Sequence, residues 1–129
     1  MESLIEEYGN GYKILREAIE GLSEEELRFK PALDKWSIHQ ILIHMSDSEM
    51  VSTQRLKKVL SEEEPLLMSI DQDAWANALG YEQLDREQYL LLFQLLRSSM
   101  LPILAQLTSE QFERVGKYAD AGRFTFKEL

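Results

Sequence analysis

Residues 36–49 read Trp36-Ser-Ile-His-Gln-Ile-Leu-Ile-His-Met-Ser-Asp-Ser-Glu49, and this stretch decides the fold. Ser37 is followed three residues later by Gln40, which is the capping-box pattern that begins a helix. Apolar residues then recur at helical spacing, namely Ile38, Ile41, Leu42 and Met45. The stretch therefore predicts the first turns of a long helix, which we expect to run from Ile38 to about Leu60.

Two further long helices are expected on either side of this one. An amphipathic helix spans Leu4–Leu22, and a helix capped by Asp85 covers Tyr89–Leu107, in which residues 90–93, Leu95 and Leu96 are apolar almost all round. Short helices are predicted after Ser23, after Asp71 or Asp73, and after Thr108. We expect no strands, because β-branched residues are scattered and no alternating run is flanked by hairpin turns.

The chain ends on a further helix start. Thr125 and Glu128 form a T-x-x-E capping box, but only four residues follow Thr125. A single turn does not repay its nucleation cost unless it packs on something. We therefore expect an all-α, up-and-down four-helix bundle, formed by one domain over residues 1–129 that is truncated at the C-terminus and lacks its last helix.

Composition excludes several classes of protein. The 23 acidic residues outnumber the 14 basic residues, and the formal net charge of -9 opposes binding to a phosphate backbone. The chain has no cysteine, so disulfides, thiolate metal sites and a cysteine nucleophile are excluded. The first residues lack the pattern of a signal peptide, and no apolar run is long enough to span a bilayer. We expect a cytoplasmic protein that binds neither nucleic acid nor membrane.

His44 is the candidate functional residue. Helical geometry places it roughly 90° from the middle of the apolar stripe formed by Ile38, Ile41, Met45, Leu56 and Val59, where it could point into a cleft between helices. Asp47 can reach the imidazole from one turn away, as a carboxylate does behind a metal-bound histidine, although we expect Asp47 to be the more exposed of the two. The alternative is a half-buried structural histidine that is hydrogen-bonded to Asp47 or Ser48.

Two other residues of this helix carry side chains that can bind a metal ion. His39 lies five residues before His44, so the rings point roughly 140° apart and cannot chelate one ion. Glu49 falls in the buried arc of the helix, where a carboxylate is either a metal ligand or, more often, the partner of an arginine such as Arg97 or Arg16. A metal site needs three or four ligands, and no H-E-x-x-H motif is present.

Several short motifs in sequence order resemble the DinB-like (YfiT-type) superfamily. The resemblance covers most of the chain. The early motifs are Gly21–Leu27, Lys30-Pro31, Trp36–Ile38 and His44–Glu49, and the later ones are Asp71, Trp75, Tyr81, Leu96-Arg97 and Gly122–Phe126.

The resemblance implies a four-helix bundle, often a homodimer, with a divalent metal (zinc or nickel) held by three histidines. His44 matches the ligand on the second helix. The other two ligands belong to an H-x-x-x-H pair on the last helix, which this chain lacks, and some members carry a histidine where this chain reads Tyr118–Gly122. The metal site implied for this chain is therefore incomplete, and we do not expect it to hold a metal tightly.

Members of the family are often thiol-dependent transferases or isomerases. The resemblance thus implies a metal-dependent enzyme that uses a low-molecular-weight thiol and a small-molecule substrate, with its site between the second and fourth helices. The alternative is a non-catalytic, dimeric binding or interaction protein of the same fold, with the apolar helix Tyr89–Leu107 as its interface.

Overall fold

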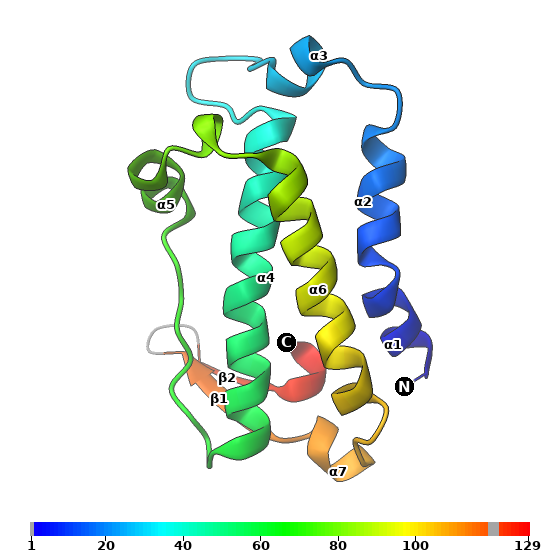
Figure 1. The fold of residues 1–129 in the computed structure, drawn as a ribbon. Coiled ribbons are helices and arrows are strands. Elements are labelled where there is room, and N and C mark those ends of the chain that lie inside the picture. The colour runs from blue at the N-terminus through cyan, green and yellow to red at the C-terminus, as the bar shows by residue number, and fades with distance from the viewer. Residues whose placement is uncertain (1, 119–121) are drawn as a thin grey trace.

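A computed structural model describes residues 2–118 and 122–129, and it shows a mainly helical protein built on three long helical segments (Figure 1). The first segment is α1 (Glu2–Gly9) followed by α2 (Gly11–Ile19), and the others are α4 (Ile38–Ser61) and α6 (Arg86–Leu104). Helix α6 packs against α4 on one side and against α1 and α2 on the other. The prediction of an all-α bundle is thus confirmed in its main architecture, although the first long helix is interrupted at Asn10.

Helix starts follow the capping residues of the sequence. Ser37 accepts a hydrogen bond from the Gln40 amide while the Gln40 side chain accepts one from the Ser37 amide, and this box begins α4 as predicted. The same reciprocal pattern begins α3 (Glu24–Arg28), α7 (Ser109–Phe112) and the final 3-10 turn η2 (Phe126–Glu128). Asp71 caps α5 (Gln72–Leu79), and Asp85 caps α6.

A two-stranded hairpin corrects the prediction that the chain has no strands. β1 (Val115–Tyr118) pairs antiparallel with β2 (Gly122–Thr125), with Gly116 opposite Phe124. Each strand has only four residues, too few to show an alternating pattern. The hairpin is anchored by tertiary contacts, since the Lys117 amide donates to the Pro65 carbonyl and its own carbonyl accepts from the Leu67 amide. A side chain at Gly116 would overlap Leu67 and Val59, so glycine is needed there.

Two clusters of buried apolar side chains lie toward opposite ends of the bundle. One cluster joins α4, α6, α7 and η2 through Leu56, Val59, Leu67, Met100, Leu104, Phe112 and Phe126. The other joins α4 and α5 to η1 (Tyr81–Gln83), a 3-10 turn just before α6, through Ile43, Ala76 and Tyr81. No helix in the described part of the chain is both long and apolar enough to cross a lipid bilayer.

The buried face of α4 differs from the predicted apolar stripe. Ile38 and Ile41 are 36% and 41% exposed, whereas His39 and Asp47 are buried. The reason is that η1 covers the polar side of the helix near its N-terminus and supplies hydrogen-bond partners to it. Polar residues can be buried where such partners are available.

Candidate functional site

His44 lies near the N-terminal end of α4. Its ring is partly exposed to solvent and otherwise lies against the aromatic residues at that end of the bundle. Its imidazole packs against Trp36 in an edge-to-face arrangement with ring centroids 5.2 Å apart. The side chain is partly exposed, while its Nδ1 atom is buried and has no hydrogen-bond partner in the described part of the chain. A buried ring nitrogen without a partner is uncommon and leaves a lone pair or a proton unsatisfied.

Asp47 does not orient His44, which corrects the sequence-based prediction. Its Oδ2 atom instead accepts a hydrogen bond of 2.6 Å from the Tyr81 hydroxyl, and the residue is only 7% exposed, less than His44. Burial and the bond to Asp47 raise the pKa of the Tyr81 phenol, so the hydroxyl remains protonated and acts as the donor. The alternative prediction was that a half-buried His44 forms a hydrogen bond with Asp47 or Ser48. No such bond is observed at its Nδ1 atom.

Tyr81 and Trp36 connect Asp47 to His44 through packing. The Tyr81 ring lies 6.2 Å from the Trp36 ring, again edge to face, and Trp36 in turn contacts the His44 ring. Asp47 fixes the Tyr81 hydroxyl, and Tyr81 and Trp36 limit the positions that the imidazole can take. Trp36 thus packs at the end of the bundle as expected, but it also touches the candidate ligand.

The residues that the structure describes do not complete a metal site. Within residues 2–118 and 122–129, no group of three or more His, Cys, Asp or Glu side chains is placed to hold an ion. His44 can supply one imidazole ligand, because its ring is partly accessible and no hydrogen bond of the ring is found among the described residues, although the Nδ1 atom itself is buried. Ala119, Asp120 and Ala121, in the segment where some members carry a histidine, lie outside the described residues.

Glu49 is the partner of an arginine, and this prediction is confirmed with Arg97. The Arg97 Nε and Glu49 Oε1 atoms are 2.8 Å apart, an ion pair in which Nε makes no well-directed hydrogen bond. Glu49 also accepts a hydrogen bond of 3.0 Å from the Tyr8 hydroxyl. Burial and the nearby Glu49 charge raise the pKa of Tyr8, which keeps this donor protonated. Glu49 is therefore occupied by structural partners and is not a free ligand.

A cavity of about 190 Å³ adjoins this ion pair, between α1, α4, α6 and η2. Its walls are largely apolar, and Tyr8 and Arg97 supply polar groups to them. Ser52, the residue of α4 in its lining that is nearest to His44, lies 8 residues beyond it, which is about 12 Å along a helix that rises 1.5 Å per residue. The cavity and His44 are therefore separate features of α4.

The sequence pattern that defines the DinB superfamily matches residues 8–129. The chain belongs to the DinB superfamily. This assignment agrees with the three long helical segments and with the order of the short motifs around His44.

Two curated proteins are similar to this chain in sequence. A Bacillus licheniformis protein named "Putative metal-dependent hydrolase" is 31% identical over 84% of this chain and 62% of its own length. The Bacillus subtilis protein named "Putative metal-dependent hydrolase YfiT" is also 31% identical, over 78% of this chain and 56% of its own length. This DinB chain thus spans less than two thirds of these curated relatives.

A solved structure of YfiT from Bacillus subtilis aligns with 98% of this DinB chain and 73% of the YfiT chain, with a TM-score of 0.90 and 26% sequence identity. Its description reads "a probable metal-dependent hydrolase with an unusual four-helix bundle topology". The likeness confirms that the segments described above are arranged as in a YfiT-type bundle.

Proposed function

We propose that this protein takes part in a metal-dependent reaction of the DinB type, with His44 as the ligand that this chain contributes. The observation that carries the proposal is the His44 ring itself, which keeps an unpaired Nδ1 atom while the other histidine, His39, has both nitrogens bonded. The relatives' names, which describe metal-dependent hydrolases, support the same type of chemistry.

The reaction that we favour is transfer or isomerisation with a low-molecular-weight thiol, as the family resemblance implies. The relatives' names instead favour hydrolysis. A divalent zinc or nickel ion supplies the same chemistry in both cases, because it lowers the pKa of a bound thiol or water and so generates the nucleophile. Cysteine cannot be the nucleophile in this chain, since it has none. The described residues support no individual catalytic step.

Metal binding at His44 can be tested by NMR, because the chain has only two histidines. We expect added Zn²⁺, which is diamagnetic, to shift the imidazole signals of His44 selectively and to leave those of His39 in place. His39 is 1% exposed, and each of its ring nitrogens already has a partner. Binding should be weak, since one imidazole does not replace the three or four ligands of a complete site.

The His44→Ala variant is the matched control for this titration. In the parent, Zn²⁺ should also shift the backbone amide signals around residue 44, and in His44→Ala these amide shifts should be absent. An equal response of these amides in His44→Ala, or an equal shift of both imidazoles in the parent, would show that His44 is not the ligand.

A homodimer is the second proposal, and one surface feature of α6 favours it. Leu91 and Leu95 are 51% and 57% exposed and lie one turn apart, and Leu92 beside them is 38% exposed. Adjacent exposed leucines on a long helix are typical of surfaces that pack against another protein. The same face would serve the alternative function, a non-catalytic dimeric binding protein.

The double variant Leu91→Lys/Leu95→Lys should sediment as a monomer in analytical ultracentrifugation at concentrations where the parent is a dimer. Two charges on each copy would be buried without partners in a symmetric interface, which is strongly unfavourable. Ile14→Lys is the control, because Ile14 is 58% exposed and lies on a different helix, α2. Identical sedimentation of the parent and the double variant would exclude this interface.

A further inference from the structure

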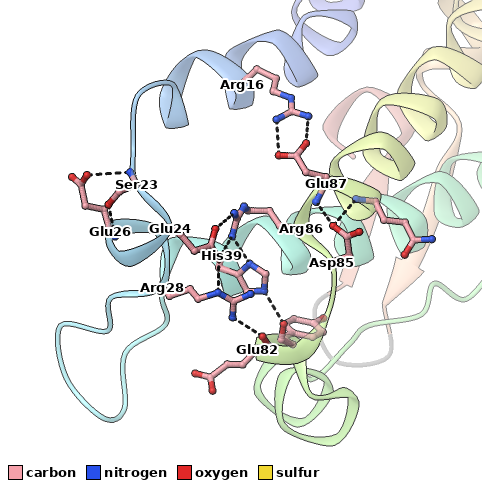
Figure 2. A network of polar contacts seen from close by, with 12 residues as sticks. Arg16, Ser23, Glu24, Glu26, Arg28, His39, Glu82, Asp85, Arg86 and Glu87 are labelled. Atoms are coloured by element: carbon pink, nitrogen blue, oxygen red, sulfur yellow. Dashed lines mark hydrogen bonds and ion pairs between the residues drawn. The ribbon is translucent and has the colours of Figure 1, made fainter.

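His39 is buried at the end of the bundle where α3, α4, η1 and α6 meet, and both of its ring nitrogens are engaged (Figure 2). Nε2 lies 3.1 Å from the Tyr81 carbonyl oxygen, and Nδ1 lies 2.8 Å from Nη1 of Arg86. Arg86 also forms an ion pair with Glu24 on α3. The imidazole therefore links α4 to η1 and α6, and through Arg86 it is also linked to α3.

The partners of His39 determine its protonation state. A carbonyl oxygen only accepts, so Nε2 must carry the hydrogen that is shared with Tyr81. A guanidinium only donates, so Nδ1 must present its lone pair to Arg86. Both contacts are satisfied only by the neutral imidazole with its hydrogen on Nε2. Protonation at Nδ1 would place a hydrogen and a positive charge against the Arg86 guanidinium.

The charges around the ring also favour the neutral form. Arg28 and Glu24 face His39 from α3 and Arg86 faces it from α6, while η1 contributes the Tyr81 carbonyl, and the Tyr81 phenol is occupied by Asp47. Two cations are thus balanced by one carboxylate. Hydrogen bonds from Arg86 and Arg28 hold the pKa of Glu24 at about 2, so Glu24 remains charged in mild acid.

We propose that His39 is a pH-sensitive switch, in which protonation of its imidazole releases Arg86 and loosens the packing of α3 and η1 on the N-terminal ends of α4 and α6. Arg28 is part of the same connection, because it donates to the Glu82 carbonyl on η1 and pairs with Glu24 (Figure 2). A solvent-filled hollow lined by Leu22, Leu27 and Arg86 adjoins the network. Release of Arg86 would widen this hollow in acid.

The direction of the pH dependence follows from the environment of the ring. Burial, followed by the Arg28 charge, lowers the pKa of His39 below the ordinary value of 6.5. As the pH falls through that value, the unfolded chain takes up a proton before the folded chain does. The stabilisation is therefore complete above pH 6.5 and is lost progressively as the pH falls toward the pKa of the folded state.

The experiment is an NMR titration of the 129-residue chain between mildly alkaline and mildly acidic pH. We expect the His39 imidazole to titrate with a midpoint below 6.5. The backbone amide signals of α3 and η1 should shift with the same midpoint. In His39→Gln these amide shifts should be absent, because a glutamine amide can donate to the Tyr81 carbonyl and accept from Arg86 but does not titrate.

Unfolding by urea at each pH gives a second measurement that does not depend on the signals near the ring. The parent should lose stability between pH 7 and pH 5 more steeply than His39→Gln. A His39 midpoint at or above 6.5, or the same pH dependence of the amide signals in the parent and in His39→Gln, would overturn the proposal. These results do not depend on whether His44 binds a metal.

Discussion

The Arg97→Met variant is expected to lower the free energy of unfolding by about 3–5 kcal/mol, the usual cost of removing one partner of a buried ion pair. The Glu49 side chain is only 6% exposed, and without Arg97 its charge keeps one hydrogen bond among the described residues, from Tyr8. Arg97 also donates to the Tyr8 carbonyl and lies over the Tyr8 ring. Methionine keeps much of the packing volume, so the loss should come mainly from the unpaired carboxylate.

The double variant Glu49→Gln/Arg97→Met is the control for this charge effect. It removes both charges while keeping an acceptor for Tyr8, so it should be more stable than Arg97→Met alone. Urea unfolding monitored by circular dichroism gives the three free energies needed for the comparison. A loss below about 1 kcal/mol in Arg97→Met, as is typical of exposed ion pairs, would contradict the buried pair described here.

The Tyr81→Phe variant is expected to lose about 1.5–3 kcal/mol, the range for a hydrogen bond to a charged group. It removes only the hydroxyl that donates to Asp47 and keeps the ring that packs on Trp36. The carboxylate of Asp47, a residue only 7% exposed, would then be left without this donor. Because the aromatic contacts remain, the variant isolates the bond from the packing, and urea unfolding measures the difference.

Tyr89→Phe is the matched control. Tyr89 packs against the same cluster as Tyr81 and is partly exposed, and no hydrogen bond of its hydroxyl is found among the described residues. It should therefore change the stability by only a few tenths of a kcal/mol, as is usual for surface substitutions. Equal losses in the two variants would show that the Asp47 bond contributes no specific stabilisation.

Local features of the sequence predicted the helices well. Capping residues such as Ser37 and Thr125 mark the helix starts that the structure shows, because a cap depends on residues within one turn of each other. The hairpin was missed for the complementary reason. Its strands are short, and β1 is held in place by Pro65 and Leu67, about 50 residues earlier in the chain.

The candidate site was predicted in part. The sequence indicated His44 as a candidate ligand and Arg97 as one of two possible partners of Glu49. The structure pairs Glu49 on α4 with Arg97 on α6, and it packs His44 against Trp36, which precedes α4. The partner of Asp47 was predicted wrongly, and no signal in the sequence showed that His39 is buried. Both residues depend on η1, whose Tyr81 lies 34 residues after Asp47 and 42 residues after His39.

By itself, the sequence determined the helical class of the fold and the place of His44 on a helix, because helix spacing and capping act between residues a few positions apart. It also determined the family, through the order of its short motifs. The tertiary structure alone decided which polar groups of α4 are buried and with what partners. An isolated helix presents His39, His44 and Asp47 alike to water, and only the packing of η1 and α6 against it supplies the donors and acceptors that allow two of them to be buried.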